Sequence, residues 1–435
     1  MKPVADKNFL KFLGEPLIEW QLGQIWNAGF KEVVLVGGAH NIEQLRALDD
    51  RMPMQIDVVE QENLDEGMSG AALAAADLIG DEPCLVFSIN DVVDAKAFEL
   101  MQEAAKGKDD VYLLAKKVTE YFPGGYLRLE NEGFVAEVVE KPEPGSEPSD
   151  LVNLVVHYFA KFSDFVGKLR EAKSKSDDVY EVGLTAMIDS GMKVRPVEYD
   201  GFWQPVKFPW HIGPVFEYLF GLKTKDGTAQ IHAGAEVSEK ATVDGPVIIE
   251  EGARVMAGAT VKGPCYIGRN CVIGSNTLVR ESNLGDGCIV GFGTEIARSH
   301  LGDDVWTHSN YIGDSVIGND VSFGAGTVTG NLRLDEGFIS VNIDTSGANG
   351  NGDVAKVPTG VNKWGLVTGD HIRVGINTSF MPGRKIGGGS YIGAGLVIAE
   401  DIPENSFARG EIKLKISENK GTFDKNARDK MRKKL

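Results

Sequence analysis

Aliphatic residues recur every six positions through the middle of the chain. The spacing does not slip over nine successive positions, which are Ile231, Val237, Val243, Ile249, Val255, Val261, Ile267, Ile273 and Val279. Neither the 3.6-residue period of a helix nor the two-residue period of a strand produces this pattern. A fixed six-residue period predicts a hexapeptide β-helix, in which three short strands form one triangular coil and the aliphatic residues face inward.

The repeat continues toward the end of the chain. Leu284, Val290 and Ile296 lie six residues from one another, and Leu301 and Thr307 resume this spacing after a repeat unit of five residues. A second run comprises Thr368, Val374, Phe380, Ile386, Ile392 and Ile398. Residues 332–363 interrupt the pattern with Gly, Asn, Asp and Ser, including the run SGANGNG at 346–352. Loops that leave a solenoid often carry its binding face, so we expect functional residues near this interruption.

The first 200 residues follow a different pattern, in which helical and strand periods alternate. We predict helices over residues 15–29, 42–48, 69–78 and 95–105, and strands over 32–37, 55–59, 84–89 and 111–115. This alternation predicts a mainly parallel sheet covered by helices, whose ligands bind beyond the carboxyl ends of the strands. Asp91 follows the strand 84–89, where a carboxylate either forms a turn or holds Mg²⁺ against a phosphate.

Length and composition agree with a two-domain protein. We expect an α/β domain over residues 1–222, a linker over 223–230, a β-helix over 231–412 and a basic tail over 413–435. The net charge of −18 argues against a nucleic-acid partner. Four cysteines without CxxC spacing indicate a reducing compartment and neither a zinc site nor a disulfide framework. No apolar run has the length of a membrane span and no signal peptide is evident, so we expect a cytoplasmic protein.

Short motifs in the first domain occur in a specific order. They are GEPLIEWQL at 14–22, Gln61 with GMSGA at 67–71, Asn90-Asp91, GGY at 124–126, VEKP at 139–142, NLVV at 153–156, Tyr180-Glu181 and Pro209-Trp210. This order resembles that of the sugar-1-phosphate nucleotidylyltransferases. Followed by a hexapeptide repeat, it resembles the archaeal-type bifunctional N-acetylglucosamine-1-phosphate uridylyltransferases/glucosamine-1-phosphate acetyltransferases. The resemblance implies a Rossmann-like nucleotidylyltransferase domain followed by a left-handed parallel β-helix.

The resemblance also implies a reaction for the first domain. The family joins a sugar 1-phosphate to a nucleoside triphosphate, here UTP or dTTP, and releases pyrophosphate with the help of Mg²⁺. Asp91 would bind Mg²⁺ and Gln61 would contact the base. Glu140 and Asn153 would bind sugar hydroxyls, and Lys141 would face the phosphate.

This chain departs from the family pattern in three places. The family opens with a strand and a glycine-rich loop, whereas this sequence starts at Met1, and Lys7 matches the lysine that follows the loop. Asn90 replaces a glycine, and Gln204 stands where an acidic residue is expected after Phe202-Trp203. Because the lost strand is central in this fold, its absence would leave backbone groups of its neighbours unpaired. We therefore expect a start upstream of Met1 or a shortened chain, and weak nucleotidyl transfer by the chain as written.

The second domain keeps its motifs better. His308 and Tyr311 match an H-x-x-Y pattern, and GAGTVTGN at 324–331 ends on Asn331. The resemblance implies that His308 is the general base for acetyl transfer from acetyl-CoA to an amino sugar, a task that suits histidine. Tyr311 and Asn331 would position the sugar or stabilise the oxyanion. Lys363 would bind phosphate, with Lys356 as its rival, and Arg409 would contact the phosphates of coenzyme A.

The family assembles as a homotrimer, which the resemblance implies here as well. Three other functions remain open: a mannose- or glucose-1-phosphate nucleotidylyltransferase with a structural β-helix, a non-catalytic subunit that senses sugar nucleotides, and a trimeric carbonic anhydrase with an interfacial zinc site. The sequence distinguishes neither glucosamine from galactosamine 1-phosphate nor UTP from dTTP.

Overall fold

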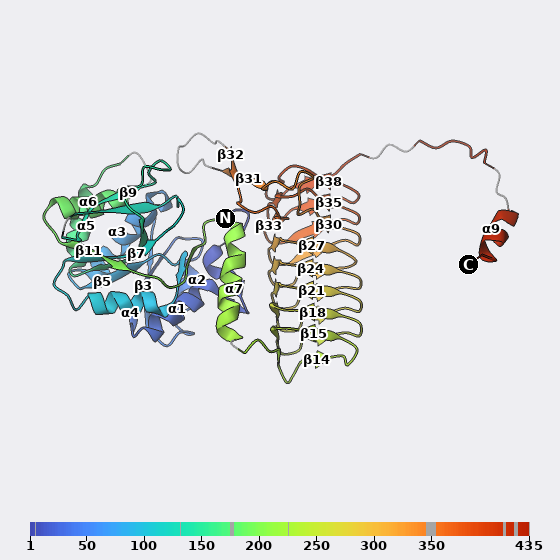
Figure 1. Cartoon of the computed structure of the whole chain (residues 1–435), viewed down its shortest axis with the longest axis horizontal. Helices are drawn as coiled ribbons and strands as arrows, with labels where there is room; N and C mark the ends of the chain where they lie inside the picture. The colour runs from blue at the N-terminus through green and yellow to red at the C-terminus, as the bar shows by residue number, and fades with distance from the viewer. Residues whose placement is uncertain are drawn as a thin grey trace.

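The computed structural model describes all residues except 5, 131, 175–177, 225, 345–353, 412–414, 422–424 and 435. Two parts follow one another along the chain (Figure 1). The first is an α/β unit that ends with helix α7 (Ile212–Lys223), and the second is a column of stacked coils.

The main sheet of the first part is mixed. Its strand order is β11-β7-β10-β8-β9, and β5 pairs with the second half of β10, from Val156 to Phe159, as a branch. Only the pair β11–β7 is parallel within it, whereas β10 runs antiparallel to β5, β7 and β8. The strands are β5 (Cys84–Phe87), β7 (Val111–Lys117), β8 (Gly125–Leu129), β9 (Val135–Glu140), β10 (Leu151–Phe159) and β11 (Val194–Glu198).

The prediction of a mainly parallel sheet is therefore wrong for the main sheet. After β7 the chain returns through the hairpin β8–β9 and not through a crossover helix, so β10 enters in the opposite direction. A separate parallel pair is formed by β3 (Glu32–Gly37) and β4 (Gln55–Glu60). Among the described residues β3 pairs only with β4 and β5 only with β10, so each has one edge without a partner strand.

Helices cover both faces of the sheet, as the alternating pattern predicted. The core between α1 (Leu17–Asn27), α4 (Ala95–Ala104) and the sheet contains Leu22, Phe98 and Met101, and a second core lies under α3 (Gly67–Ile79), α5 (Phe162–Glu171) and α6 (Val179–Asp189). The predicted helices and strands all occur, with ends that differ by a few residues. The remaining elements are η1 (Lys7–Phe9), β1 (Lys11–Phe12), β2 (Glu15–Pro16), α2 (Ile42–Arg46), η2 (Leu64–Glu66), β6 (Asp91–Val93), β12 (Trp203–Pro205) and η3 (Pro209–His211).

The second part is the predicted three-sided parallel β-helix (Figure 1). Its first face stacks β13 (Gln230–Ile231), β16 (Val247–Ile249), β19 (Cys265–Ile267), β22 (Asn283–Leu284), β25 (His300–Leu301), β28 (Val316–Ile317), β33 (Val367–Thr368) and β36 (Lys385–Ile386). The second face stacks β14 (Glu236–Val237), β17 (Arg254–Val255), β20 (Val272–Ile273), β23 (Ile289–Val290), β26 (Trp306–Thr307), β29 (Val321–Phe323), β34 (Ile372–Val374), β37 (Tyr391–Ile392) and β39 (Phe407–Ala408). The third face stacks β15 (Thr242–Asp244), β18 (Thr260–Lys262), β21 (Leu278–Arg280), β24 (Glu295–Ala297), β27 (Tyr311–Gly313), β30 (Val328–Thr329), β35 (Ser379–Phe380) and β38 (Val397–Ile398).

The repeat positions form the column of the β-helix core, with one exception. Ile249, Ile267 and Ile273 are almost completely buried, and so are Thr307 and Thr368 of the interrupted hexads. Ile231 was predicted to face inward but is 47 % exposed, because its coil is the first and only one side of it is covered by another coil. Three hexads of six residues make a coil of 18, so Ile249 pairs with Ile267 in the next coil. Where one hexad has only five residues the coil has 17, so Ile267 pairs with Leu284.

Helix α7 and the N-terminal hairpin pack against the first face of the β-helix (Figure 1). Ile212, Phe216 and Phe220 share one apolar cluster with Tyr266 and Val316 of that face. Polar contacts add to it: Lys11 Nζ lies 2.6 Å from Asp303 Oδ2, and the Leu13 amide donates to Asn283 Oδ1 at 3.0 Å. The first face is therefore covered by the protein's own first domain, and the other two faces are left for other contacts.

The interruption of the repeat forms a hairpin of β31 (Ser340–Asp344) and β32 (Val354–Pro358), and the run 346–352 lies outside the described residues. The basic tail contains α9 (Lys425–Arg432), which Figure 1 places far from the coils. None of the described helices has the length and apolarity needed to cross a membrane.

Candidate functional site

Asp91 opens strand β6, beside β12, which pairs with it antiparallel. Trp203 Nε1 of β12 donates a hydrogen bond to Asp91 Oδ1 at 2.9 Å, and Gln21 Nε2 donates to the Asp91 carbonyl at 3.0 Å. Burial raises the pKa of the Asp91 carboxyl, and the hydrogen bond from Trp203 with the charges of Lys207 and Lys7 opposes that rise. Burial also lowers the pKa of Lys7. The charges of Lys7 and Lys207 thus act on the predicted metal ligand, and both ammonium groups can neutralise phosphate charge.

The surroundings of Asp91 fit Mg²⁺ with a single carboxylate ligand. Oδ1 is engaged by Trp203, and the adjacent Asn90 has a buried side-chain oxygen without a hydrogen-bond partner. Mg²⁺ commonly binds one or two carboxylates and completes its shell with water and phosphate oxygens. Within the described residues no group of three or more His, Cys, Asp or Glu side chains could form an all-protein metal cage.

Glu140, Lys141 and Asn153 meet around the GGY motif. Glu140 ends β9 opposite Gly125, and a Cβ added at Gly125 would lie 3.1 Å from Glu140 Oε2 and 3.7 Å from Asn153 Cβ. Lys141 Nζ lies 3.1 Å from Glu140 Oε1, and the Lys141 amide donates to the Gly124 carbonyl at 3.1 Å. The two predicted sugar ligands are therefore brought together, and the glycine between them leaves the space that a side chain would fill.

A buried histidine that the sequence analysis missed supports Asn153. His157 is fully buried on β10, and its Nε2 lies 3.0 Å from Asn153 Oδ1 while its Nδ1 lies 3.0 Å from the Tyr180 hydroxyl. Burial lowers the pKa of His157 to about 3, so the ring is neutral at pH 7. Its one signal in the sequence was a histidine inside an otherwise apolar strand, four residues after Asn153.

The Asp91 cluster and the sugar ligands lie at the same edge of the sheet. The Ser88 amide, which follows β5, donates to the Val155 carbonyl at 3.0 Å, two residues from Asn153. Gln61 follows β4, where its amide nitrogen donates to the carbonyls of Asn63 at 2.8 Å and Gly67 at 3.1 Å. Both hydrogens of that nitrogen shape the loop before α3, which leaves Oε1 as the atom of Gln61 that could meet a base.

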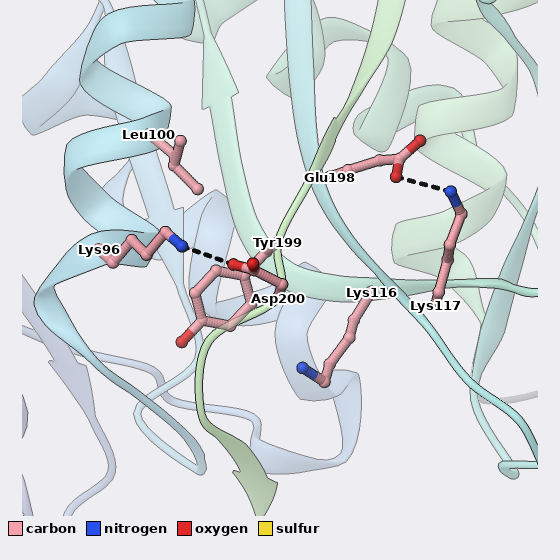
Figure 2. A pocket seen from close by; sticks show the side chains of 7 residues that line it. All are labelled: Lys96, Leu100, Lys116, Lys117, Glu198, Tyr199 and Asp200. Atoms are coloured by element: carbon pink, nitrogen blue, oxygen red, sulfur yellow. Dashed lines mark hydrogen bonds and ion pairs between the residues drawn. The ribbon is translucent and has the colours of Figure 1, made fainter.

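A cavity of about 420 Å³ lies nearby, at the carboxyl ends of β7 and β11 (Figure 2). Three lysines line it, and each has a partner: Lys96 pairs with Asp200 at 2.6 Å, Lys117 with Glu198 at 2.8 Å, and Lys116 donates to the Gly201 carbonyl at 2.7 Å. It shares no lining residue with the Asp91 cluster. Since these ammonium groups are already neutralised or hydrogen-bonded, the cavity is a weaker phosphate site than the surroundings of Asp91.

His308 lies at the corner between the second and third faces of the β-helix. It directly follows β26 and is exposed, and its backbone amide donates to Asn310 Oδ1. By strand register, the equivalent corner positions are Gly291 in the preceding coil and Gly324, Gly375, Gly393 and Arg409 in the following ones. A Cβ at Gly291 would lie 3.0 Å from His308 Nδ1, so the glycine lets the imidazole rest on the coil next to it. The corner therefore runs from His308 to Arg409 without an intervening side chain in this column.

Tyr311 and Asn331 form a hydrogen-bonded cluster on the third face. Asn331 Nδ2 donates to the Tyr311 hydroxyl at 3.0 Å and to Asp314 Oδ2 at 2.5 Å. Arg298 holds the same carboxylate through Nε at 2.6 Å and Nη2 at 2.8 Å. His308 begins the short turn that leads to Tyr311, although none of the described hydrogen bonds joins the two. Sequence reasoning missed Asp314 and Arg298, whose only signal is that Asp314 ends the HSNYIGD segment.

The structure favours Lys363 over Lys356 as the neighbour of this cluster. Lys363 forms an antiparallel bridge with Leu332, and the following Trp364 amide donates to the Asn331 carbonyl at 2.9 Å. Lys356 instead pairs with Asn342 in the hairpin β31–β32.

Two family models match the chain. The nucleotidyl transferase model matches residues 3–206, and the model of bacterial transferase hexapeptide (six repeats) matches residues 246–281. The crystal structure of UDP-glucose pyrophosphorylase complexed with UDP-glucose is 19 % identical, with a TM-score of 0.44 over 51 % of this chain and 92 % of that chain.

Curated relatives match almost the whole length. The bifunctional sugar-1-phosphate nucleotidylyltransferase/acetyltransferase of Sulfurisphaera tokodaii is 29 % identical over 406 residues, which are 92 % of this chain and 94 % of the relative. The bifunctional protein GlmU of Methanocaldococcus jannaschii is 33 % identical over 362 residues, covering 81 % of this chain and 80 % of the relative. With both domains present in the same order, this chain belongs to the GlmU family of bifunctional nucleotidyl- and acetyltransferases.

Proposed function

We propose that the β-helix transfers an acetyl group from acetyl-CoA to the amine of glucosamine 1-phosphate, and that the first domain joins N-acetylglucosamine 1-phosphate to UTP or dTTP. The main support for acetyl transfer is the position of His308 at a corner of the β-helix. Its coil also contains Tyr311 and Asp314, which form a hydrogen-bonded cluster with Asn331.

In the acetyl transfer, the amine lone pair attacks the thioester carbonyl and forms the C–N bond. His308 accepts the proton that the nitrogen must lose, and the C–S bond then breaks to release the thiol of coenzyme A. Tyr311 lies on β27, the strand that follows His308, and Asn331 follows β30 of the next coil. This hydrogen-bonded pair supplies groups to orient the sugar or stabilise the oxyanion. Lys363, an exposed cation beside Asn331, provides a partner for the sugar phosphate.

The corner column supports a site for acetyl-CoA. Arg409 lies four coils from His308, which at a strand spacing of ~4.8 Å is a rise of roughly 19 Å. The three positions between them are glycines, so an extended thiol-bearing arm can lie along the corner. Arg409 would then meet the phosphates at the far end of the molecule.

In the first domain, Asp91 would hold Mg²⁺, which when bound neutralises phosphate charge. Lys7 and Lys207 lie close enough to Asp91 to alter its pKa and would meet the same phosphates. Glu140 and Asn153 would bind the sugar, Lys141 its phosphate and Gln61 the base. We propose that this activity is weak, because Gln204 supplies an amide where a second carboxylate is expected, and that amide bonds to the Pro205 carbonyl at 3.2 Å.

We further propose a homotrimer in the cytoplasm. The first face of the β-helix is covered by the chain's own first domain, so subunit contacts would use the other two faces. These faces expose large apolar side chains, including Trp306 at 54 %, Tyr391 at 56 % and Val397 at 69 %. All four cysteines are free thiols, as in reducing compartments.

Release of coenzyme A thiol tests the acetyl transfer. The full chain is mixed with acetyl-CoA and either glucosamine or galactosamine 1-phosphate, and free thiol is measured for wild type, His308→Ala and the control His371→Ala. We expect His308→Ala to lower the rate by roughly 10²–10⁴-fold, the usual worth of a general base. His371, also exposed on the β-helix and paired with Asp320, should be dispensable.

Two outcomes would contradict the proposal. A wild-type chain that releases no thiol with either amino sugar would favour a structural β-helix. An undiminished rate in His308→Ala would remove this histidine from the mechanism.

A further inference from the structure

The carboxylate of Asp314 is held in one orientation by Arg298. It lies after β27, its side chain is 9 % exposed, and it accepts two hydrogen bonds from the Arg298 guanidinium. Such a fork of parallel hydrogen bonds stabilises an ionised carboxylate. The same pair raises the pKa of Arg298 further, so the guanidinium remains a charged donor.

An ionised carboxylate can only accept hydrogen bonds, which settles the orientation of Asn331. The atom of Asn331 that meets Asp314 Oδ2 must be the amide nitrogen, and the same nitrogen also lies 3.0 Å from the Tyr311 hydroxyl. Both hydrogens of that nitrogen are therefore used inside the cluster. The side-chain oxygen of Asn331 has no partner among the described hydrogen bonds.

The Tyr311 hydroxyl accepts the hydrogen bond that Asn331 Nδ2 donates. Its own proton is then available to another group, because the oxygen already receives a hydrogen from Asn331. The ring lies along its strand over Gly313, where an added Cβ would come within 2.6 Å of the hydroxyl oxygen. Glycine at 313 thus allows the position in which the hydroxyl meets Asn331.

We propose that Asp314 and Arg298 are positioning residues that fix the hydrogen-bond polarity of the acetyl-acceptor site, so that Asn331 offers an acceptor, Tyr311 offers a donor, and a primary amine is selected over a hydroxyl. This rests on the proposed acetyl transfer. An attacking amine has two N–H groups: one hydrogen bonds to Asn331 Oδ1, and the other proton passes to His308 as the C–N bond forms. The Tyr311 proton stabilises the carbonyl oxygen that becomes negative, until the C–S bond breaks and the thiolate leaves with the proton from His308.

A hydroxyl nucleophile cannot satisfy the same arrangement. It has one proton, which must go to the base, and the oxygen of Asn331 is then left without the donor that the second N–H of an amine supplies. A site built to bond an N–H rejects an analogue that lacks it far more strongly than a pocket that recognises shape alone. The structure therefore predicts N-acetylation without O-acetylation.

The test uses Asp314→Asn in the full chain. An amide at 314 can accept from Arg298 with its oxygen and then presents its NH₂ group to Asn331, which must rotate and reverse the polarity. We expect kcat for glucosamine 1-phosphate to fall about 10²-fold, the order found on removing one oxyanion donor. The KM for acetyl-CoA should change little. The control Asp320→Asn also breaks a carboxylate–arginine pair, with Arg373 at 2.6 Å, but does not contact Asn331.

A double-mutant cycle separates positioning from simple structural support. If Asp314 acts through Asn331 and Tyr311, Asp314→Asn should cost little more in a chain that already carries Asn331→Ala and Tyr311→Phe. An equal loss in both backgrounds would overturn the proposal. If Asp314→Asn does not fold, Arg298→Lys, which keeps the charge and loses the fork, takes its place in the same cycle with the same two outcomes.

The result is distinguishable from a failure of the proposed function. A wild-type chain without acetyl transfer would contradict the function itself. A wild-type chain that acetylates the amine, with Asp314→Asn equally active and equally selective against glucose 1-phosphate, would contradict only the positioning role.

Discussion

Burial decides the charge of two histidines in the structure. His157 lies inside the main sheet and His300 at the domain junction, where its ring centroid is 5.1 Å from that of Phe12. Burial lowers the pKa of His157 to about 3 and that of His300 to about 4, although Asp303 near His300 opposes the change. Both are neutral in the folded chain at pH 7 and would become charged in the unfolded chain on acidification.

The sign of the resulting pH dependence follows from these values. Between pH 6.5 and about 4 the unfolded chain binds more protons at His300 than the folded chain, so the free energy of unfolding falls as the pH falls. The loss approaches about 1.4 kcal/mol per pH unit for each such histidine. We expect His300→Phe to melt with a shallower pH dependence than wild type, as measured by calorimetry between pH 7 and 4.5.

The matched control is His40→Phe, whose side chain is 57 % exposed. It should leave the slope unchanged, and part of the slope should survive in His300→Phe because His157 still contributes. Identical slopes for wild type and His300→Phe would show that the junction stays closed when this histidine is protonated.

At the scale of elements, the corners of the β-helix depend on glycine because successive coils approach closely. A Cβ at Gly291 would lie 2.5 Å from the Thr307 carbonyl oxygen and 3.0 Å from His308 Nδ1. A Cβ at Gly274, one coil earlier in the same column, would lie 2.8 Å from the Val290 carbonyl oxygen and would not meet His308. Gly274 and Gly291 both allow the backbones of successive coils to approach closely, but only Gly291 lies against His308, the candidate base.

This difference allows a matched pair of variants. Gly291→Ala and Gly274→Ala should both lower the free energy of unfolding, by about 1–3 kcal/mol for overpacking. Only Gly291→Ala should also lower kcat of acetyl transfer, by on the order of tenfold or more, since it displaces the imidazole. The measurement is thiol release at a temperature at which both variants are folded, and equal kcat values in the two variants would refute the contact with His308.

At the scale of the whole molecule, the arrangement of the domains restricts how copies of the chain can associate. The first face of the β-helix lies under α7 and the N-terminal hairpin, whereas the second and third faces carry exposed apolar side chains. Exposed apolar surface of this kind marks association sites. The same two faces meet at the corner that carries His308, so association would place a neighbouring subunit beside the candidate site.

Trp306, which is 54 % exposed on the second face, tests this arrangement. We expect Trp306→Asp to convert the proposed trimer to a smaller species in light scattering coupled to gel filtration, because a charge would be buried in the interface. The control is Leu78→Asp on α3, where the side chain is 53 % exposed on the first domain and should not affect assembly. A wild-type monomer, or a trimer that persists in Trp306→Asp, would contradict the assignment of the interface.

The pattern of residues by itself determined the architecture of the chain. A six-residue spacing of Ile and Val has one packing solution, so the β-helix and almost all of its inward residues followed from the sequence. The alternating periods of the first 200 residues likewise defined the helices and strands, because each buries one side against its neighbours. The residues of the candidate sites were identified through motif order, and the structure brings Glu140 to Asn153 and Tyr311 to Asn331.

Only the tertiary structure decided which residues support those sites and how the strands run. The direction of β10 depends on the hairpin β8–β9, and the local pattern of apolar residues does not reveal how that hairpin turns. The prediction of a mainly parallel sheet was therefore wrong. Ile231 kept the repeat but lies at an end of the stack, where burial depends on whether another coil follows. His157, Asp314 and Arg298 carry no motif of their own. Folding places His157 and Asp314 each within hydrogen-bond distance of an asparagine amide whose orientation must be fixed, and it places Arg298 against the carboxylate of Asp314.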